Sequence, residues 1–127
     1  MAKKTLNIVE SAYRAVMEEQ DDTILWLLAA MQGAGAEHTV VLRGNAVNYA
    51  VRQACPPLAI GSAIIKHPAR PNDDLTQLLA KGAKVYVIRE DLAERGIGED
   101  RCVAEAQPLA RAEVVDLMES HDQVWHW

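Results

Sequence analysis

The stretch Lys84-Val-Tyr-Val-Ile-Arg-Glu-Asp-Leu-Ala-Glu-Arg-Gly-Ile97 decides the fold of this chain. Its first half is an apolar run of strand-forming residues, and its second half is charged, has helical composition and closes at Arg-Gly. A buried strand that passes directly into a helix is typical of a parallel α/β sheet. Sites in such sheets form where the strands end, so the segment also marks the edge at which we expect a site.

Strand-like and helix-like segments alternate along the rest of the chain. We expect strands at residues 5–9, 38–42 and 83–88, a weaker one at 103–109, and a last one at 123–127. Residues 12–20 have helical composition, and helices are expected at 22–32, 46–53, 73–81 and 113–120. The expected N-caps of the first three of these helices are Asp21 or Asp22, Asn45 and Asn72. The pattern predicts one small α/β domain over residues 1–127, flavodoxin-like or Rossmann-like, with a mostly parallel five-stranded sheet and helices on both faces.

Residues 54–71 break this alternation, because five prolines and glycines interrupt any periodicity. The segment is longer than most connections in small domains, which favours a functional or interface loop. Ile60, Ile64 and Ile65 lie within it and need cover from the fold or from another subunit.

Composition limits the classes of partner. The 127 residues carry a formal net charge of −5 with no basic cluster beyond Lys3-Lys4, so we expect no nucleic-acid or membrane partner. The longest apolar run, residues 24–31, is far shorter than a bilayer span, and the N-terminal segment lacks a signal-peptide core. We therefore expect a cytoplasmic protein.

Familiar catalytic and cofactor motifs are missing from the sequence. It has no GxGxxG, no P-loop and no GxSxG, so we expect no cofactor and disfavour a small nucleotide-binding domain. The two cysteines, Cys55 and Cys102, form no CxxC and have no histidine at ligand spacing, so we expect neither a disulfide nor a metal site. Each reads most simply as an incidental free thiol.

Sequence motifs in the second half of the chain resemble those of a known family. Residues 84–97, 111–121 and the ending Asp122-Gln-Val-Trp-His-Trp127 resemble the DsrE/DsrF/DsrH (Tus) sulfur-relay family, and Glu-Asp-Leu-x-x-Arg-Gly with the terminal Trp is most similar to its DsrH/TusB branch. The Arg43-Gly-Asn-Ala-Val47 turn is similar to the family's Gly-Asp-Ala-Val. The resemblance implies a DsrE-like domain, a homo-oligomer (trimer or hexamer), and a sulfur-carrier protein or related DsrE-family subunits as partners.

One residue departs from the family pattern. Active DsrE-type members accept a persulfide sulfur on a cysteine about seven residues before Arg-Gly, and here that position is Ile88. An alkyl side chain supplies no thiolate. Two alternatives remain: a non-catalytic subunit that binds a partner or ligand, or a sulfurtransferase that uses a displaced cysteine. Cys55, in a loop near Arg52, is the better candidate for the second role, and Cys102 is the weaker one.

Polar residues at the expected strand ends are the remaining site candidates. Glu10 and Ser11 follow the first strand, Asn45 follows the second, and Glu90, Asp91 and Arg95 follow the third. A structural reading competes for each, since Asn45 suits a helix cap and Arg95 is spaced to pair with Asp91 at i,i+4. Trp125 and Trp127 share one face of the last strand, where they either pack under the last helix or lie between subunits.

Overall fold

A five-stranded parallel sheet forms the centre of the computed structural model, which describes residues 3–12, 23–68 and 70–127. Its strand order is β6-β5-β2-β1-β7, and every neighbouring pair is parallel. The strands are β1 (Lys4–Val9), β2 (Glu37–Leu42), β5 (Lys84–Ile88), β6 (Gln107–Leu109) and β7 (Gln123–His126). The predicted fold class is confirmed, and the weak fourth strand is shorter than expected.

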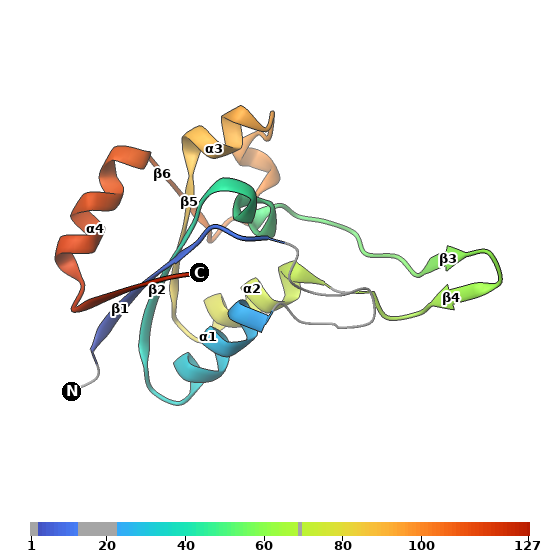
Figure 1. Cartoon of the computed structure of the whole chain (residues 1–127), viewed down its shortest axis with the longest axis horizontal. Coiled ribbons are helices and arrows are strands. Elements are labelled where there is room, and N and C mark those ends of the chain that lie inside the picture. The colour runs from blue at the N-terminus through green and yellow to red at the C-terminus, as the bar shows by residue number, and fades with distance from the viewer. Residues whose placement is uncertain (1–2, 13–22, 69) are drawn as a thin grey trace.

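Helices cover both faces of this sheet (Figure 1). Helices α1 (Thr23–Gly33) and α2 (Pro71–Ala80) pack together on one face, and α4 (Val114–Ser120) lies on the other. Short helical turns connect strands at the ends of the sheet: η1 (Gly44–Ala50), α3 (Arg89–Glu94), η2 (Glu99–Arg101) and η3 (Arg111–Glu113). Within the described ranges, no helix is both long and apolar enough to cross a membrane.

Strand alternation divides the apolar side chains into two cores. Val9, Val40, Leu42, Val85 and Val87 face α1 and α2 and belong to the larger core. The alternate positions face α4 and form a smaller core, which consists of Leu6, Ile8, Val41, Ile88 and Val114. Both faces of the three central strands are therefore buried, which explains why these segments read as nearly continuous apolar runs.

Residues 58–65 form a β-hairpin that the sequence did not predict. Strands β3 (Leu58–Ile60) and β4 (Ala63–Ile65) pair antiparallel, and the Gly61-Ser62 turn joins them. Gly61 has a φ of +60°, a conformation that glycine adopts without strain. We call this hairpin the arm, because it reaches away from the body of the molecule (Figure 1).

Two predicted helix caps are wrong. Asn45 lies inside η1, whose N-cap is Arg43, and Asn72 lies inside α2, whose N-cap is Arg70. The amide of Asn72 instead bonds the backbone of Tyr49 and Gln53, so it joins α2 to the end of η1. The polar side chains that were expected to cap helices instead make contacts with residues far away in the sequence. The helical composition at 12–20 and the cap at Asp21 or Asp22 fall almost entirely outside the described residues.

The two C-terminal tryptophans do not pack under α4. Trp125 pairs in register with Asn7, and the indole N–H of Trp127 donates to the Asn7 side-chain oxygen at 3.1 Å. Asn7 alternates with Leu6 and Ile8, which face α4, so both rings lie on the α1 face. The rings meet edge to face with their centroids 6.2 Å apart, and Trp125 also lies against His38.

Candidate functional site at the carboxyl edge of the sheet

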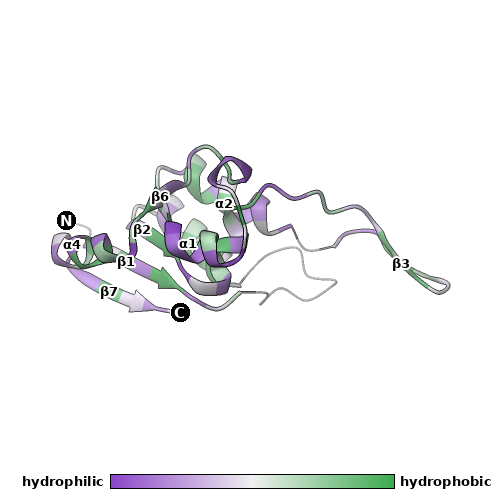
Figure 2. Ribbon diagram, turned by 90° about the horizontal axis from the view of Figure 1, so that it is seen from above, coloured by the Kyte–Doolittle hydropathy of each residue, from purple (hydrophilic) through white to green (hydrophobic). Residues whose placement is uncertain are grey.

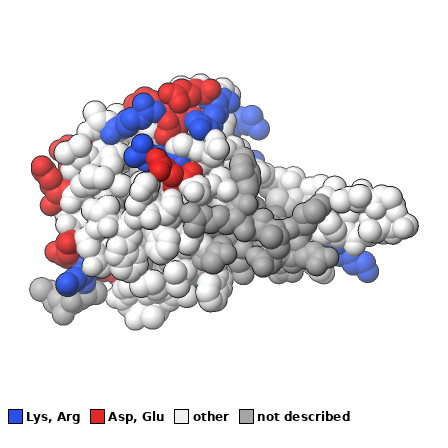
Figure 3. All heavy atoms as spheres, viewed as in Figure 1, with Lys and Arg blue, Asp and Glu red and all other residues white. Residues whose placement is uncertain are grey.

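The predicted polar residues meet at the carboxyl edge of the sheet, where β1, β2 and β5 end. Charged side chains gather over this edge around α3, at the top of the molecule in Figure 3. Six candidates lie here, namely Glu10, Ser11, Asn45, Glu90, Asp91 and Arg95. Parallel strands bring their carboxyl ends to one edge, so this gathering follows from the topology.

Asp91 is the centre of the contacts at this edge. Its carboxylate is almost fully buried, and it accepts hydrogen bonds from the Gly44 amide at 2.8 Å and from the Arg111 guanidinium at 2.6 Å. The Gly44 amide can reach Asp91 because Gly44 adopts a φ of +57°, a left-handed conformation that suits glycine. One buried carboxylate thus joins the turns that follow β2, β5 and β6.

Electrostatics favour the charged form of Asp91. Burial alone raises the pKa of its carboxyl, but the hydrogen bonds from Gly44 and Arg111 and the charges of Arg111 and Arg95 outweigh burial. The pKa of Asp91 therefore lies below its ordinary value of 3.8. A carboxylate held ionised by two donors is suited to organising the edge and unsuited to taking up a proton near neutral pH.

The other candidates after β5 and β2 join Asp91 in one set of contacts. Glu90 accepts a hydrogen bond from the Arg111 backbone amide at 2.6 Å. Arg95 does not pair with the Asp91 carboxylate as predicted. Its guanidinium donates to the Asp91 backbone oxygen at 3.1 Å and to the Asn45 side-chain oxygen at 2.9 Å. We call this set of contacts the Asp91 network. It consists of Gly44, Asn45, Glu90, Asp91, Arg95 and Arg111, and the polar groups of these residues bind mainly to one another.

A second group of polar side chains lies at the end of β1. Glu10 accepts from the His126 ring at 2.7 Å and pairs with Arg43 at 3.0 Å. Strands β2, β5 and β6 are added to the sheet on one side of β1, and β7 is added on the other side. Open α/β sheets usually bind ligands at such a change of side. All three side chains are partly exposed, so these contacts contribute little stability and leave Glu10 accessible. Ser11, the next residue, is exposed.

Sequence reasoning missed three residues of this edge: Arg43, Arg111 and His126. Arg43 and Arg111 each follow a strand that was predicted, so the rule that selected Glu10 would also have selected them. His126 lies near the end of the chain, where the sequence gives no sign of its partner. Only the parallel pairing of β7 with β1 brings it to Glu10.

Ile88, which the resemblance to DsrE-type proteins aligns with their acceptor cysteine, lies beneath this edge. Only 1% of its surface is exposed, and it packs in the core under α4. The last residues of β5 therefore alternate between the two cores, and the polar side chains begin one residue later. A thiol at this position would be enclosed by apolar side chains.

Neither cysteine joins the carboxyl-edge contacts. Cys102 is buried beside Val51, and burial, together with the nearby charges of Glu99 and Asp100, raises the pKa of its thiol despite Arg52. Cys55 is half-buried in the segment between η1 and the arm. The Arg52 guanidinium is directed to the backbone oxygens of Asp100 and Cys102 rather than serving Cys55.

Comparisons with known proteins agree with this architecture. The ychN protein from E. coli has a similar structure, with a TM-score of 0.74 and 17% sequence identity over 100% of both chains. MTH1491 from Methanobacterium thermoautotrophicum, a protein of unknown function, has a TM-score of 0.65 and 11% identity over 100% of both chains. No curated protein sequence gives a match.

The sequence match identifies a protein family, which the structural similarities do not. At such low identities the two structures show the fold alone. The model of DsrH-like proteins matches residues 58–124, which is more than half of the chain. The matched part includes the arm, the Asp91 network apart from Gly44 and Asn45, and β7 up to Val124. The chain therefore belongs to the DsrH-like family, which implies a subunit of a sulfur relay.

Proposed function

We propose that this chain is a non-catalytic subunit of intracellular sulfur trafficking, in sulfur oxidation or in a tRNA-thiolation relay, that binds partners rather than accepting sulfur at the end of β5. The observation that carries the proposal is Ile88, which is an alkyl side chain and 1% exposed. Persulfide transfer needs an accessible thiolate to attack the donor sulfur. At this position both the thiol and the access are missing.

The surroundings of Ile88 support the same conclusion. Next to it on the edge, Asp91 is held by Gly44 and Arg111, and Arg95 is held by Asn45. These side chains satisfy one another, which suits a scaffold. Among the described residues of this edge there is no cysteine, and Cys102 is enclosed with a raised thiol pKa.

The arm supplies a surface for assembly. Leu58, Ile60 and Ile64 are exposed by 42%, 54% and 63%, and residues 58–65 carry no charged side chain. Figure 2 shows the hairpin projecting from the body, and Figure 3 shows it almost free of acidic and basic groups. Apolar side chains on a projecting hairpin with unpaired strand edges suit burial against another chain. The proposed assembly is a cytoplasmic homo-oligomer, a trimer or hexamer, and related DsrE-family subunits or a sulfur-carrier protein are the other candidate partners.

Light scattering of the purified chain tests the assembly. We expect the mass of a trimer or hexamer, and we expect Ile64→Asp to shift it toward the monomer because a carboxylate cannot be buried unpaired in an apolar interface. Val115→Asp is the matched control, since Val115 is 57% exposed on α4, away from the arm. A monomeric wild type would contradict the proposed oligomer.

A sulfurtransferase that uses Cys55 is the alternative function. Cys55 is half-buried rather than enclosed, and the preceding residue, Ala54, lines a cavity of about 420 Å³ with Arg52 and Arg101. Incubation with a persulfide donor followed by mass spectrometry separates the two functions. The main proposal predicts no added sulfur on the native protein. An added sulfur atom that Cys55→Ser abolishes and Cys102→Ser retains would establish the alternative.

A further inference from the structure

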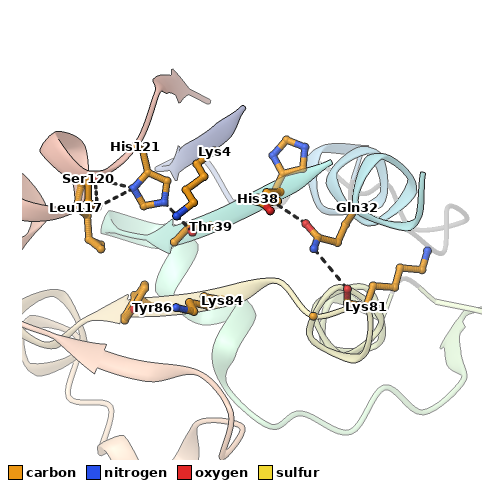
Figure 4. Close-up of a pocket in the computed structure, with 12 residues that line it drawn as sticks. Lys4, Gln32, His38, Thr39, Lys81, Lys84, Tyr86, Leu117, Ser120 and His121 are labelled. Atoms are coloured by element: carbon orange, nitrogen blue, oxygen red, sulfur yellow. Dashed lines mark hydrogen bonds between the residues drawn. The ribbon is translucent and has the colours of Figure 1, made fainter. Parts of the chain in front are cut away.

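A cavity of about 640 Å³ opens at the amino edge of the sheet, opposite the Asp91 network. The start of β1, the starts of β2 and β5, and the C-terminal ends of α1, α2 and α4 surround it (Figure 4). Its volume lies within the range of small-molecule sites. None of the residues that line this cavity belongs to the carboxyl edge, and the proposed sulfur-relay function does not use them.

Three of the chain's five lysines line this cavity, namely Lys4, Lys81 and Lys84. Among the described residues, Glu37 is the only carboxylate in the lining, and none of the three lysines forms a salt bridge. Asp122 lies close by, and its carboxylate accepts from the backbone amide of Lys4. A net positive cavity in a chain of net charge −5 is the reverse of what composition alone would give.

Strand alternation directs two of these lysines to one face. Lys4 has the same parity as Leu6 and Ile8, and Lys84 has the same parity as Ile88, so both belong to the face that α4 covers. In the view of Figure 4 the Lys4 side chain runs toward Thr39 and His121, and Lys84 extends from β5 beside Tyr86. Lys81 is turned away and donates to the Ala29 backbone oxygen at 3.0 Å. Lys4 and Lys84 are therefore the two cavity cations without a side-chain partner in the described part of the chain, and both are available to a ligand.

Hydrogen bonds hold the walls of the cavity in place. The His121 ring bonds the Leu117 backbone oxygen at 2.6 Å with Nδ1 and the Thr39 hydroxyl at 2.8 Å with Nε2, so it joins α4 to β2. On the opposite side, the Gln32 side chain accepts from the His38 amide at 2.8 Å and donates to the Lys81 backbone oxygen at 3.4 Å. These contacts fix the lining without using the ammonium groups of Lys4 and Lys84.

We propose that this amino-edge cavity binds a small phosphorylated molecule, with its phosphate between Lys4 and Lys84. Lysine ammonium groups bind phosphate as point charges, whereas planar carboxylates favour the paired donors of arginine. No arginine of the described residues lines the cavity. The half-buried Tyr86 and Leu117 also face the cavity and provide apolar contact for the rest of the ligand. The cavity is larger than a phosphate group alone requires, which favours an organic phosphate.

Calorimetric titration with inorganic pyrophosphate at low ionic strength tests this site. We expect wild type to bind and the double variant Lys4→Gln/Lys84→Gln to bind about tenfold more weakly or worse, because each free ammonium contributes to holding the anion. Lys66→Gln is the matched control. Lys66 is exposed just after the arm, so its replacement removes one positive charge outside the cavity, whereas the double variant removes two inside it. Backbone NMR shifts on titration should centre on Thr39, Tyr86 and Leu117.

Three outcomes would overturn the proposal. They are no pyrophosphate binding by wild type, an equal loss of affinity in Lys66→Gln and the double variant, or shifts centred on residues outside the cavity. Citrate, a tricarboxylate that carries nearly the same charge as pyrophosphate near neutral pH, tests the ligand class, and binding as tight as that of pyrophosphate would overturn the phosphate assignment. Circular dichroism of each variant ensures that a loss of affinity is not a loss of fold.

Discussion

At the carboxyl end of the sheet Arg43, Arg89, Arg95 and Arg111 each meet a carboxylate, whereas at the amino end Lys4 and Lys84 meet none in the described part of the chain. Paired charges at the first edge connect successive turns, and among them the buried Asp91 carboxylate with Arg111 is the pair expected to stabilise the fold. Unpaired charges at the second edge do nothing for stability and remain available to a ligand. The difference shows that a dense group of charged residues can be structural, while a sparser group of one sign can be the better binding site.

The largest expected effect is the loss of the Asp91 carboxylate. Asp91→Ala removes the acceptor of Gly44 and the partner of Arg111, and we expect it to lower the free energy of unfolding by about 3 kcal/mol. Urea unfolding measures the change. Asp116→Ala, which removes an exposed carboxylate on α4, should change the free energy by less than about 0.5 kcal/mol. Equal effects would show that the carboxyl edge is not held by its paired charges.

The Asp91 contribution should also depend on pH with a known sign. Its folded-state pKa lies below 3.8, so the ionised carboxylate stabilises the fold above that pH, and this stabilisation is lost as the pH falls through the folded-state value. The difference in unfolding free energy between wild type and Asp91→Asn should therefore be full at neutral pH and shrink in strong acid. A constant difference would contradict the assigned ionisation.

A thiol placed at Ile88 tests whether the carboxyl edge is closed. In a Cys55→Ser/Cys102→Ser background, Ile88→Cys should react with a thiol reagent at least about tenfold more slowly than Cys55 does in wild type, because reaction requires local opening of the core under α4. Circular dichroism checks the fold. Labelling as fast as that of Cys55 would mean that this edge is an open, degenerate sulfur site.

His38 should give a smaller, acid-side effect near the amino end. Burial lowers the pKa of its imidazole below 6.5, and its Nε2 has no hydrogen-bond partner within the described residues. Between pH 6.5 and the folded-state pKa the unfolded chain binds the extra proton, so stability falls as the pH falls through this window. We expect the unfolding free energy to fall as the pH is lowered below 6.5, measured by urea unfolding. His38→Gln should reduce this loss, and the exposed His67→Gln should retain it.

The smallest expected effect belongs to the free lysines. Lys4→Gln/Lys84→Gln should leave the unfolding free energy unchanged or raise it by less than about 0.5 kcal/mol, because no ion pair is lost and like charges are removed. Thermal unfolding at low salt detects a change of this size. A clear destabilisation would mean that these lysines are structural, as the arginines of the opposite edge are.

The sequence by itself determined the fold class and most of the carboxyl edge. Mostly apolar runs at residues 5–9, 38–42 and 84–88 predict buried parallel strands, since a strand covered on both faces has few polar positions. Parallel strands share an edge, so Glu10, Asn45 and Asp91 were expected together before any contact was known. The resemblance to DsrH-like proteins also came from short sequence motifs, and the family match confirms this resemblance.

Only the tertiary structure decided which residues meet. Arg111 is 20 residues from Asp91, Trp127 is 120 from Asn7 and His121 is 82 from Thr39, so none of these pairs leaves a periodic signal in the sequence. The amino-edge cavity has the same origin: Lys4 and Lys84 line one cavity because β1 and β5 flank β2 in the strand order. That order depends on how the connections pack rather than on any strand's own residues. Local propensity determines which segments become strands, and packing over the whole chain determines their neighbours.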